Sequence, residues 1–270
     1  MDDDPRNADW QKAQLQTMAR SAASRYGLDE SELALIFHGE NATFRTRLPG
    51  GPTMLLRLHG DHYNTAEQIR SELDVLAYLA DAGLPVQRPL RPDGITPPIF
   101  VESPAGSDVF PGRWASVLTW IHGDSVRDHC KRTGEDLGYY YQLCGALMAR
   151  LHEALEAFQP PSGFDRRTWN RRALLETTAF AGTMDELWRL IPAEHRTTLR
   201  EQIDWAGTQV DAAVASEPMR LIHGDLHLSN IIVTADGSIG AIDFDDAGFG
   251  PRLYDVAASV KTPDDASDAS

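Results

Sequence analysis

The segment Leu-Ile-His-Gly-Asp-Leu-His-Leu-Ser-Asn at residues 221–230 decides how the rest of this chain is interpreted. Its tripeptide His-Gly-Asp, at 223–225, also occurs at 59–61 and at 122–124. Each of the two earlier copies directly follows a predicted strand, and Gly and Asp are common residues of strand-ending turns. The residues after the third copy distinguish it from the others, so we assign the chemistry to that copy.

A β-hairpin is predicted directly after Asn230. Two apolar runs, at 231–234 and 239–242, enclose the turn sequence Ala-Asp-Gly-Ser at 235–238, and Asp243 follows the second run. If the arms pair in register, Asn230 and Asp243 stand at the same open end, on strands about 4.8 Å apart. Because Mg²⁺ prefers oxygen ligands and is usually held by one or two protein groups plus substrate phosphates, the hairpin predicts a magnesium site.

Asp225 precedes Asn230 by five residues. In a loop of that length its carboxylate can lie beside the metal without ligating it, and can accept a proton from a hydroxyl group. An Asp base, a metal-binding Asn five residues later and a metal-binding Asp after a hairpin is the order of parts in kinase phosphoryl transfer. The segment therefore predicts transfer of a phosphoryl group to a hydroxyl.

Three motifs resemble the aminoglycoside phosphotransferase superfamily, which includes choline, homoserine and fructosamine kinases and a bacterial stress-response protein kinase. They are His-Gly-Asp-Leu-His-Leu-Ser-Asn at 223–230, Ile-Asp-Phe-Asp-Asp at 242–246 and Gly-Pro-Arg-Leu-Tyr-Asp-Val at 250–256. The resemblance extends from about Phe37 to Val256. It implies that ATP and Mg²⁺ are the cofactors, with Asp225 as the catalytic base and Asn230 and Asp243 as the metal ligands. It also implies a structural role for His223, and leaves His227 either touching substrate or packed.

The resemblance implies a bilobal, protein-kinase-like α+β fold, with residues 1–119 as a small β-rich lobe and 120–270 as a larger helical lobe. The residue pattern fits this division, because strand-like runs dominate the first part and three- and four-residue apolar spacing the second. The predicted strands are 33–37, 43–48, 53–58 and 114–121; the predicted helices are 8–26, 65–83, 137–155, a loosely periodic 169–190 and one opened by Pro192.

A kinase also needs a cation on the phosphates, held by a carboxylate on the neighbouring helix. Arg57 on the third strand and Glu72 on the next helix match those two places, although many members of the family have Lys at the strand position. Arginine can still pair with a carboxylate and with phosphate oxygens in bidentate fashion. Glu72 borders the apolar stripe of its helix; the alternative is a solvated glutamate.

The remaining nucleotide contacts are implied by the resemblance. The segment His-Gly-Glu-Asn-Ala-Thr at 38–43 is similar to the family's Glu-Asn-x-Thr-Phe variant, which makes Asn41 and Thr43 the phosphate cover. Adenine is expected against the backbone of Thr119, Trp120 and Ile121 between the lobes.

Composition limits the classes of protein that fit. With 270 residues, 42% of them hydrophobic, the chain is long enough for about two folding units. The net charge of −15 disfavours a nucleic-acid partner and mildly favours cationic ligands. Cys130 and Cys144 lack the spacing of a zinc site or a disulfide framework. The sequence shows no signal peptide and no long apolar run, so we expect a cytoplasmic protein without membrane contact. The sequence does not determine the oligomeric state.

Several alternatives stay open at this point. Alternating His223, Asp225 and His227 also fits a metallohydrolase, and Asp243 with Asp245 resembles the acids of aspartyl-phosphate phosphatases. A non-catalytic binding protein with a kinase fold is a third alternative, because fold does not guarantee activity.

Within the family, the acceptor is an aminoglycoside, homoserine or choline-like alcohol, or a protein serine, and ATP is not distinguished from GTP. Family members usually continue with further helices after residues 254–256, so we expect the acceptor site of this chain to be affected by its short C-terminus.

Overall fold

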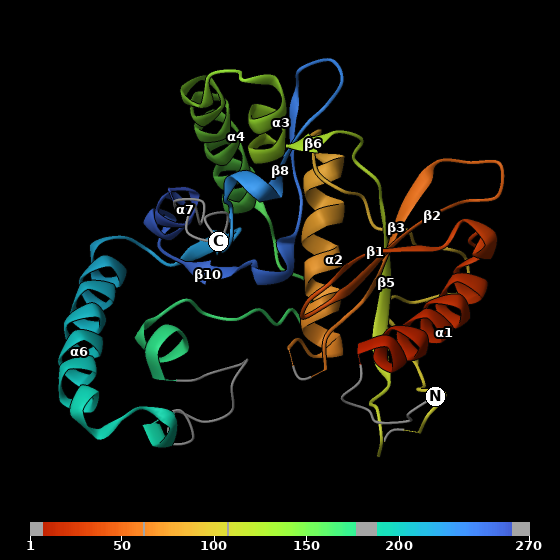
Figure 1. Ribbon diagram of the computed structural model, residues 1–270. Helices are drawn as coiled ribbons and strands as arrows, with labels where there is room; N and C mark the ends of the chain where they lie inside the picture. The colour runs from red at the N-terminus through yellow and green to blue at the C-terminus, as the bar shows by residue number, and fades with distance from the viewer. Residues whose placement is uncertain (1–7, 62, 107, 177–187, 261–270) are drawn as a thin grey trace. The chain divides into compact units, whose positions relative to one another are not determined.

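The computed structural model describes most of the chain (Figure 1). The described residues are 8–61, 63–106, 108–176 and 188–260. Among them, no helix combines the length and the apolarity that a membrane-spanning helix needs.

The chain divides into two compact units, which are described one at a time. The first consists of residues 1–77 and 87–121, and the second of 78–86 and 122–270. The sequence-based division at residue 119 assigned 78–86 to the first lobe, whereas the structure groups this segment with the C-terminal residues.

A five-stranded antiparallel sheet forms the first unit, in the order β1-β2-β3-β5-β4. Four of its strands begin within one residue of the predicted positions, and the one predicted at 114–121 ends earlier, at Thr119. The strand β4 was not predicted, because three residues are too few for an alternating pattern to be recognised. The strands are β1 (Ala34–His38), β2 (Ala42–Arg47), β3 (Thr53–Leu58), β4 (Ile99–Val101) and β5 (Arg113–Thr119).

The long helix α1 (Ala8–Tyr26), red in Figure 1, covers one face of this sheet. Successive side chains of a strand point to opposite faces, so β3 presents Met54, Leu56 and Leu58 to one side and Arg57 to the other. Those three apolar residues join one buried cluster with the inner face of α1. The alternation therefore separates the core of the unit from the face that carries its charged residues.

Helix α2 (Ala66–Asp81) begins at the predicted capping box. The Thr65 N–H donates to Gln68 Oε1 at 3.1 Å, and the Gln68 N–H donates to Thr65 Oγ1 at 3.2 Å. This reciprocal pair satisfies two amide groups that would otherwise lack a helical acceptor. The cap fixes where the helix starts, and hence which of its turns carries Glu72.

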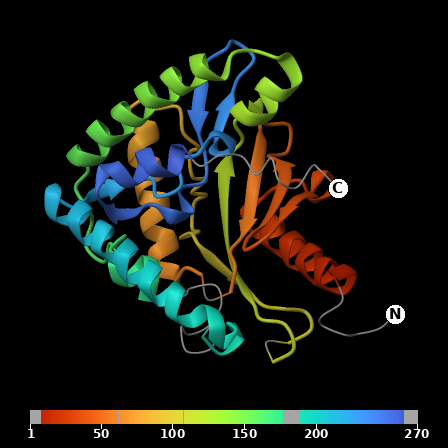
Figure 2. The ribbon, with the colours of Figure 1, turned by 60° about the vertical axis from the view of Figure 1, so that its left-hand side comes forward.

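The second unit combines short sheets with helices. The hairpin strands β8 (Ile231–Val233) and β9 (Ile239–Ala241) extend a three-stranded sheet that begins with β6 (Asp124–Ser125), and they can be followed as paired blue arrows in Figure 2. The Ala241 N–H donates to the carbonyl of Pro85 at 2.9 Å, which explains why residues 78–86 belong to this unit.

The remaining elements of the second unit flank this sheet in sequence. The predicted helix at 137–155 is present as α4, and the helix opened by Pro192 is present as α6. Of the loosely periodic stretch 169–190, residues 172–176 form a short π-helical turn, and 177–187 lie outside the described residues. The further elements are α3 (Val126–Thr133), α4 (Leu137–Ala157), α6 (Ala193–Ser216), β7 (Arg220–Ile222), β10 (Gly248–Gly250) and α7 (Arg252–Ser259).

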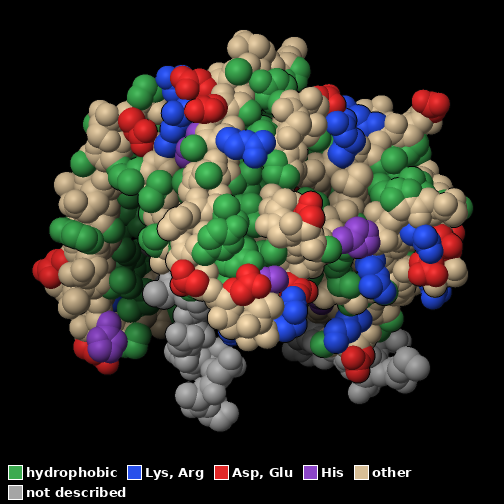
Figure 3. Space-filling view, turned by 90° about the horizontal axis from the view of Figure 1, so that it is seen from above, with side chains coloured by type: hydrophobic (Ala, Val, Ile, Leu, Met, Phe, Trp, Pro, Cys, Tyr) green, Lys and Arg blue, Asp and Glu red, His purple; other side chains and the backbone are tan. Residues whose placement is uncertain are grey.

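The surface in Figure 3 carries acidic and basic side chains interspersed with hydrophobic ones. The net charge of −15 is therefore not gathered into a single acidic field on that face.

Candidate functional site

Asp225 and Asn230 both lie in the loop between β7 and β8, and Asn230 is its last residue. The Asn230 Nδ2 atom is 2.9 Å from the backbone carbonyl oxygen of Asp225 and 3.1 Å from its Oδ2 atom. Both partners are acceptors, so the contacting atom of the amide must be its nitrogen. The amide oxygen is thereby directed away from Asp225, which leaves it as the atom of Asn230 that can ligate a cation.

The register of the hairpin places Asp243 at the same end as Asn230. Ile231 pairs with Ala241, and the Ile242 N–H donates to the carbonyl of Asn230 at 2.9 Å, so Asp243 is the next residue beyond the paired end. Asp243 has φ 66° and ψ 66°, and no other described residue except glycine has a positive φ. Such a conformation costs about 1–3 kcal/mol and is concentrated at functional sites.

The two histidines of the loop have fixed tautomers. The Asp225 N–H points to His223 Nδ1 at 3.3 Å, and the Ser229 N–H points to His227 Nδ1 at 3.2 Å. A backbone N–H can only donate, so in each neutral ring Nδ1 is the acceptor and Nε2 carries the proton. His223 Nε2 then donates to the carbonyl of Ile242 at 3.0 Å, a contact that links the loop to the hairpin.

His227 touches the expected base. Its Nε2 atom lies 3.3 Å from Asp225 Oδ2, the oxygen that Asn230 also contacts. Two donors thus hold one oxygen of the Asp225 carboxylate, and this fixes the orientation of the group.

Asp255, on α7, binds the backbone of the loop. The sequence analysis did not identify this residue as part of the site. Its Oδ2 accepts the His223 N–H at 3.0 Å, its Oδ1 accepts the Gly224 N–H at 2.7 Å, and His152 Nε2 lies 2.8 Å from Oδ2. The residue is 1% exposed. A buried carboxylate with three donors fixes the backbone immediately before Asp225. The motif at 250–256 contained this residue, but nothing in its spacing indicated its partners.

The pKa of Tyr254 is affected by the negative charges around the expected base. Burial raises its pKa to about 12, and the negative charges of Asp246, Asp225 and Asp255 add to the effect. The phenol is therefore protonated at neutral pH. Its ring stacks on Trp169 with centroids 5.3 Å apart.

In the first unit, Arg57 and Glu72 form a buried ion pair. Arg57 Nη1 is 3.2 Å from Glu72 Oε1, and the two side chains are 5% and 1% exposed. Thr43 is the direct cross-strand partner of Arg57, so their side chains share one face of the sheet. The structure thus brings together three of the residues expected at the phosphates and shows that Glu72 is not a solvated helix glutamate.

Asn41 holds the turn between β1 and β2. Its Oδ1 accepts the Gly60 N–H at 2.8 Å. A Cβ atom at Gly60 would lie 2.5 Å from the carbonyl oxygen of Glu40, so the close approach of the two turns requires glycine. Asn41 acts here on the backbone of the loop, which explains an Asn at this position independently of any phosphate.

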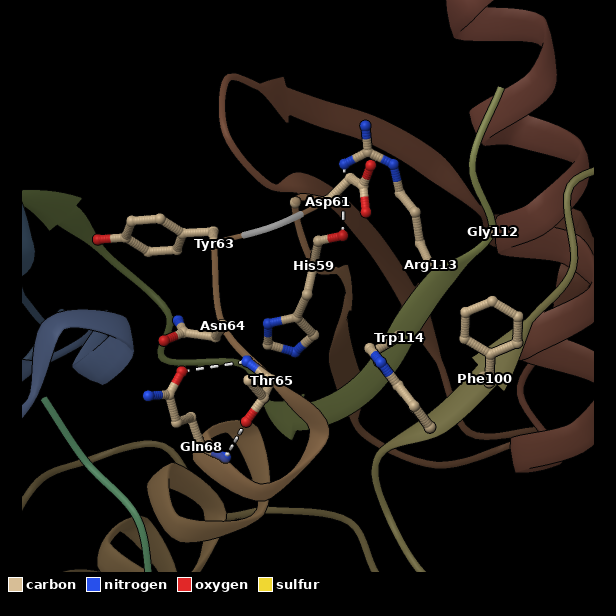
Figure 4. A pocket seen from close by; sticks show the side chains of 11 residues that line it. His59, Asp61, Tyr63, Asn64, Thr65, Gln68, Phe100, Gly112, Arg113 and Trp114 are labelled. Carbon is tan, nitrogen blue, oxygen red and sulfur yellow. Dashed lines mark hydrogen bonds between the residues drawn. The ribbon is translucent and has the colours of Figure 1, made fainter. Parts of the chain in front are cut away.

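A cavity of about 440 Å³ lies beside this support (Figure 4). Arg113 extends along it and donates to the carbonyls of His59 at 3.3 Å and Glu40 at 3.4 Å. Burial lowers the pKa of Arg113, and the neighbouring Asp61 opposes that shift. The cavity does not include Asn41, Thr43, Arg57 or Glu72. It is lined by His59, Gly60, Asp61, Tyr63, Asn64, Thr65, Gln68, Phe100, Gly112, Arg113 and Trp114.

The three residues expected to contact adenine differ in whether their backbone groups are already hydrogen-bonded. The Thr119 N–H donates to the carbonyl of Arg88 at 2.8 Å, and the Trp120 N–H is 3.3 Å from the carbonyl of Thr53. Within the part of the chain that the structure describes, no backbone hydrogen bond uses the carbonyl of Trp120 or the N–H of Ile121.

The sequence model of the phosphotransferase enzyme family matches residues 37–269. The chain belongs to this phosphotransferase family. The match includes the strands β2 to β5 and the loop and hairpin that hold Asp225 and Asp243, as the motifs predicted.

Relatives of this family member include small-molecule kinases. A homoserine kinase of Methylobacillus flagellatus is 25% identical over 212 residues, which are 76% of this chain and 55% of that protein. The chain spans between 52% and 64% of the length of three curated relatives that it matches.

Solved structures share its fold. An amicoumacin kinase, in a complex with AMP-PNP, Ca²⁺ and Ami, has a TM-score of 0.72 at 20% identity, and the match covers 94% of this chain and 71% of that one. A microcompartment-associated aminopropanol kinase has a TM-score of 0.68 at 24% identity and covers 90% of this chain and 73% of its own. The predicted kinase-like α+β fold is confirmed.

Proposed function

We propose that this protein transfers the γ-phosphoryl group of MgATP to a hydroxyl group of a small molecule. The observation that carries the proposal is the pairing of Asn230 Nδ2 with Asp225, at the hairpin end that also carries Asp243. This leaves a carboxylate and an amide oxygen for a cation and a second, oriented carboxylate for a proton. A metallohydrolase would need further His or Cys ligands near His223 and His227, whereas both rings are occupied by contacts with the loop and the hairpin.

The donor set fits Mg²⁺, because carboxylate and amide oxygens are hard ligands. Asn230 and Asp243 would hold the ion, which supplies charge neutralisation of the phosphates when bound. The residues of the chain do the rest. Asp225, oriented by Asn230 and His227, accepts the proton of the acceptor hydroxyl while the oxygen forms its bond to phosphorus. The bond from the γ-phosphorus to the bridging oxygen breaks, and ADP leaves with that electron pair.

The first unit would hold the nucleotide. Arg57, fixed by Glu72, faces phosphate oxygens, and the turn fastened by Asn41 covers them. Of the three residues expected at adenine, the Thr119 N–H is already bonded, whereas the carbonyl of Trp120 and the N–H of Ile121 take part in no backbone hydrogen bond among the described residues and can meet a purine edge.

An amino alcohol is the acceptor class that we propose. Relatives and structural neighbours include kinases named for homoserine and aminopropanol, both of which carry an amine and a hydroxyl. The charge of −15 and the carboxylates around Tyr254 favour a cationic acceptor over an anionic one.

The test is an ADP-release assay with MgATP and a panel of homoserine, hydroxylysine, 1-amino-2-propanol, ethanolamine and choline. Two controls are included. One is a protein substrate such as casein, and the other is a deoxy analogue, that is, an amine of the panel without its hydroxyl group. We expect acceptor-dependent ADP release by the native protein with at least one amino alcohol, and none with the deoxy analogue. Turnover of casein alone would favour a protein kinase, and no turnover of any member would contradict the proposal.

A further inference from the structure

The segment after α4 runs beside the turn that follows Asp243. The Phe249 N–H donates to the carbonyl of Arg167 at 2.9 Å, and the Trp169 N–H donates to the carbonyl of Phe249 at 2.7 Å. Thr168 and Phe249 form a parallel β-bridge. These bonds fix residues 166–169 against β10, within the same unit as the hairpin.

The guanidinium group of Arg166 donates hydrogen bonds to backbone carbonyls. Its Nη2 donates to the carbonyls of Phe244, at 3.3 Å, and Asp245, and its Nε donates to the carbonyl of Ala247. The residue is 5% exposed. A buried arginine that binds three carbonyls of a single short turn stabilises one conformation of that turn, because its planar fork has a fixed donor geometry.

Trp169 and Arg167 bind the remaining residue of the turn, Asp246. Trp169 Nε1 donates to the carbonyl of Asp246 at 2.9 Å, and Arg167 Nη1 is 3.1 Å from Asp246 Oδ1. Together, Arg166, Arg167 and Trp169 bind every residue from 244 to 247. We refer to these three residues as the clamp.

The clamp acts on both halves of the site. Asp243 directly precedes the clamped turn and has the left-handed conformation. Gly224 directly precedes Asp225, and a Cβ atom at Gly224 would lie 2.3 Å from the carbonyl oxygen of Asp246 and 2.9 Å from Trp169 Nε1. The backbone of the expected base is therefore packed against the bond that Trp169 makes.

We propose that Arg166 and Trp169 are positioning residues that keep Asp243 in its left-handed, cation-binding conformation. The inference rests on the proposed role of Asp243 as a metal ligand. Without the clamp, the carbonyls of Asp245, Asp246 and Ala247 lose these donors, whereas the carbonyl of Phe244 still accepts the Ala247 N–H. The strain at Asp243 can then relax by rotation to a negative φ, which changes the direction of its carboxylate.

Metal affinity is the property that this rotation changes. Loss of a group that orients a metal ligand typically weakens metal binding by roughly 10–100-fold. A structural role alone would lower thermal stability and leave the affinity of the remaining folded protein for metal unchanged.

The experiment measures Mn²⁺ binding by electron paramagnetic resonance in the presence of saturating AMP-PNP. The variants are Arg166→Met, Arg166→Lys and Trp169→Phe, with Asp243→Asn as the variant in which the expected ligand has lost its negative charge. Arg171→Met is the matched control, because Arg171 lies in the same connection and pairs with Asp204 and Asp211 on α6. Circular dichroism gives the folded fraction of each protein.

We expect Arg166→Met to weaken Mn²⁺ binding by roughly 10–100-fold, and Arg166→Lys and Trp169→Phe to weaken it less. Arg171→Met should bind as the native protein does. Native-like Mn²⁺ affinity in folded Arg166→Met overturns the inference. If that variant does not fold, Trp169→Phe decides, and native-like affinity there overturns it.

Failure of the proposed function gives a different pattern. In that case the native protein does not retain Mn²⁺ with AMP-PNP, or Asp243→Asn binds it equally well. If only the inference about the clamp is wrong, Asp243→Asn binds Mn²⁺ more weakly than the native protein, whereas the Arg166 and Trp169 variants bind it with native affinity.

Discussion

Replacing Asp255 by Asn should release the loop that carries Asp225. The carboxylate of Asp255 accepts hydrogen bonds from the backbone N–H groups of His223 and Gly224 and from His152, at distances from 2.7 to 3.0 Å. An amide of the same shape has one acceptor oxygen, and its NH₂ group faces donors in place of the second oxygen. The substitution therefore removes the charge from all three bonds and leaves at least one buried donor without an acceptor.

The size of the effect follows from these contacts. A hydrogen bond to a charged group contributes about 1.5–3 kcal/mol, and an unpaired buried donor costs about 1–3 kcal/mol. Asp255 is 1% exposed, so water cannot replace the lost acceptor. We expect a loss of about 3–5 kcal/mol in the free energy that keeps the loop closed, which corresponds to at least a hundredfold increase in local opening.

Amide hydrogen exchange of the peptide that spans residues 221–230 measures this opening directly. The amides of His223 and Gly224 should exchange at least about a hundredfold faster in Asp255→Asn than in the native protein. Asp236→Asn is the control, because Asp236 also accepts from a backbone N–H, that of Ser238, but in an exposed turn. Equal protection of the two amides in Asp255→Asn and the native protein would refute the anchoring role.

Three further outcomes are expected. Glu72→Gln should lower the free energy of unfolding by about 3–5 kcal/mol, because it removes the negative charge that is paired with the buried guanidinium of Arg57. A double-mutant cycle with Arg57→Met isolates the contribution of the pair, and a loss under about 1 kcal/mol would contradict this expectation. Burial, with help from Arg113 and Lys12, lowers the pKa of His38, so His38 should destabilise the fold as the pH falls below its unfolded value of about 6.5; NMR titration of native protein and Arg113→Gln should show the pKa rising only in part, since burial is the larger cause. Asn41→Ala should raise the KM for ATP about fivefold with little change in kcat, because the Gly60 N–H loses its acceptor; an unchanged KM would show that the turn does not depend on this bond.

The features that sequence predicted are those encoded by short-range patterns. The alternation of β3, the capping box of Thr65 and Gln68 and the hairpin after Asn230 each depend on residues within about ten positions of one another. Such patterns are set by backbone geometry that neighbouring residues determine alone. The placement of Asp243 at the end of the hairpin followed from them.

The features that sequence missed depend on distant partners. Asp255 bonds to residues 31 and 32 positions earlier and to His152, 103 positions earlier. Arg166 bonds to carbonyls 78 to 81 positions later. Backbone carbonyls and N–H groups have no residue type, so no pattern of side chains marks where such an arginine or carboxylate finds its partners.

The central claim, that Asp225 is the base for phosphoryl transfer, is tested most directly by Asp225→Asn. Rapid-quench measurement of γ-phosphate transfer from saturating MgATP to the acceptor found in the panel should show a rate that is lower by about 10²–10⁴-fold. The Kd for AMP-PNP should stay within about threefold of the native value, because Asp225 is not expected to hold the nucleotide. Transfer by Asp225→Asn at a rate close to that of the native protein would contradict the account.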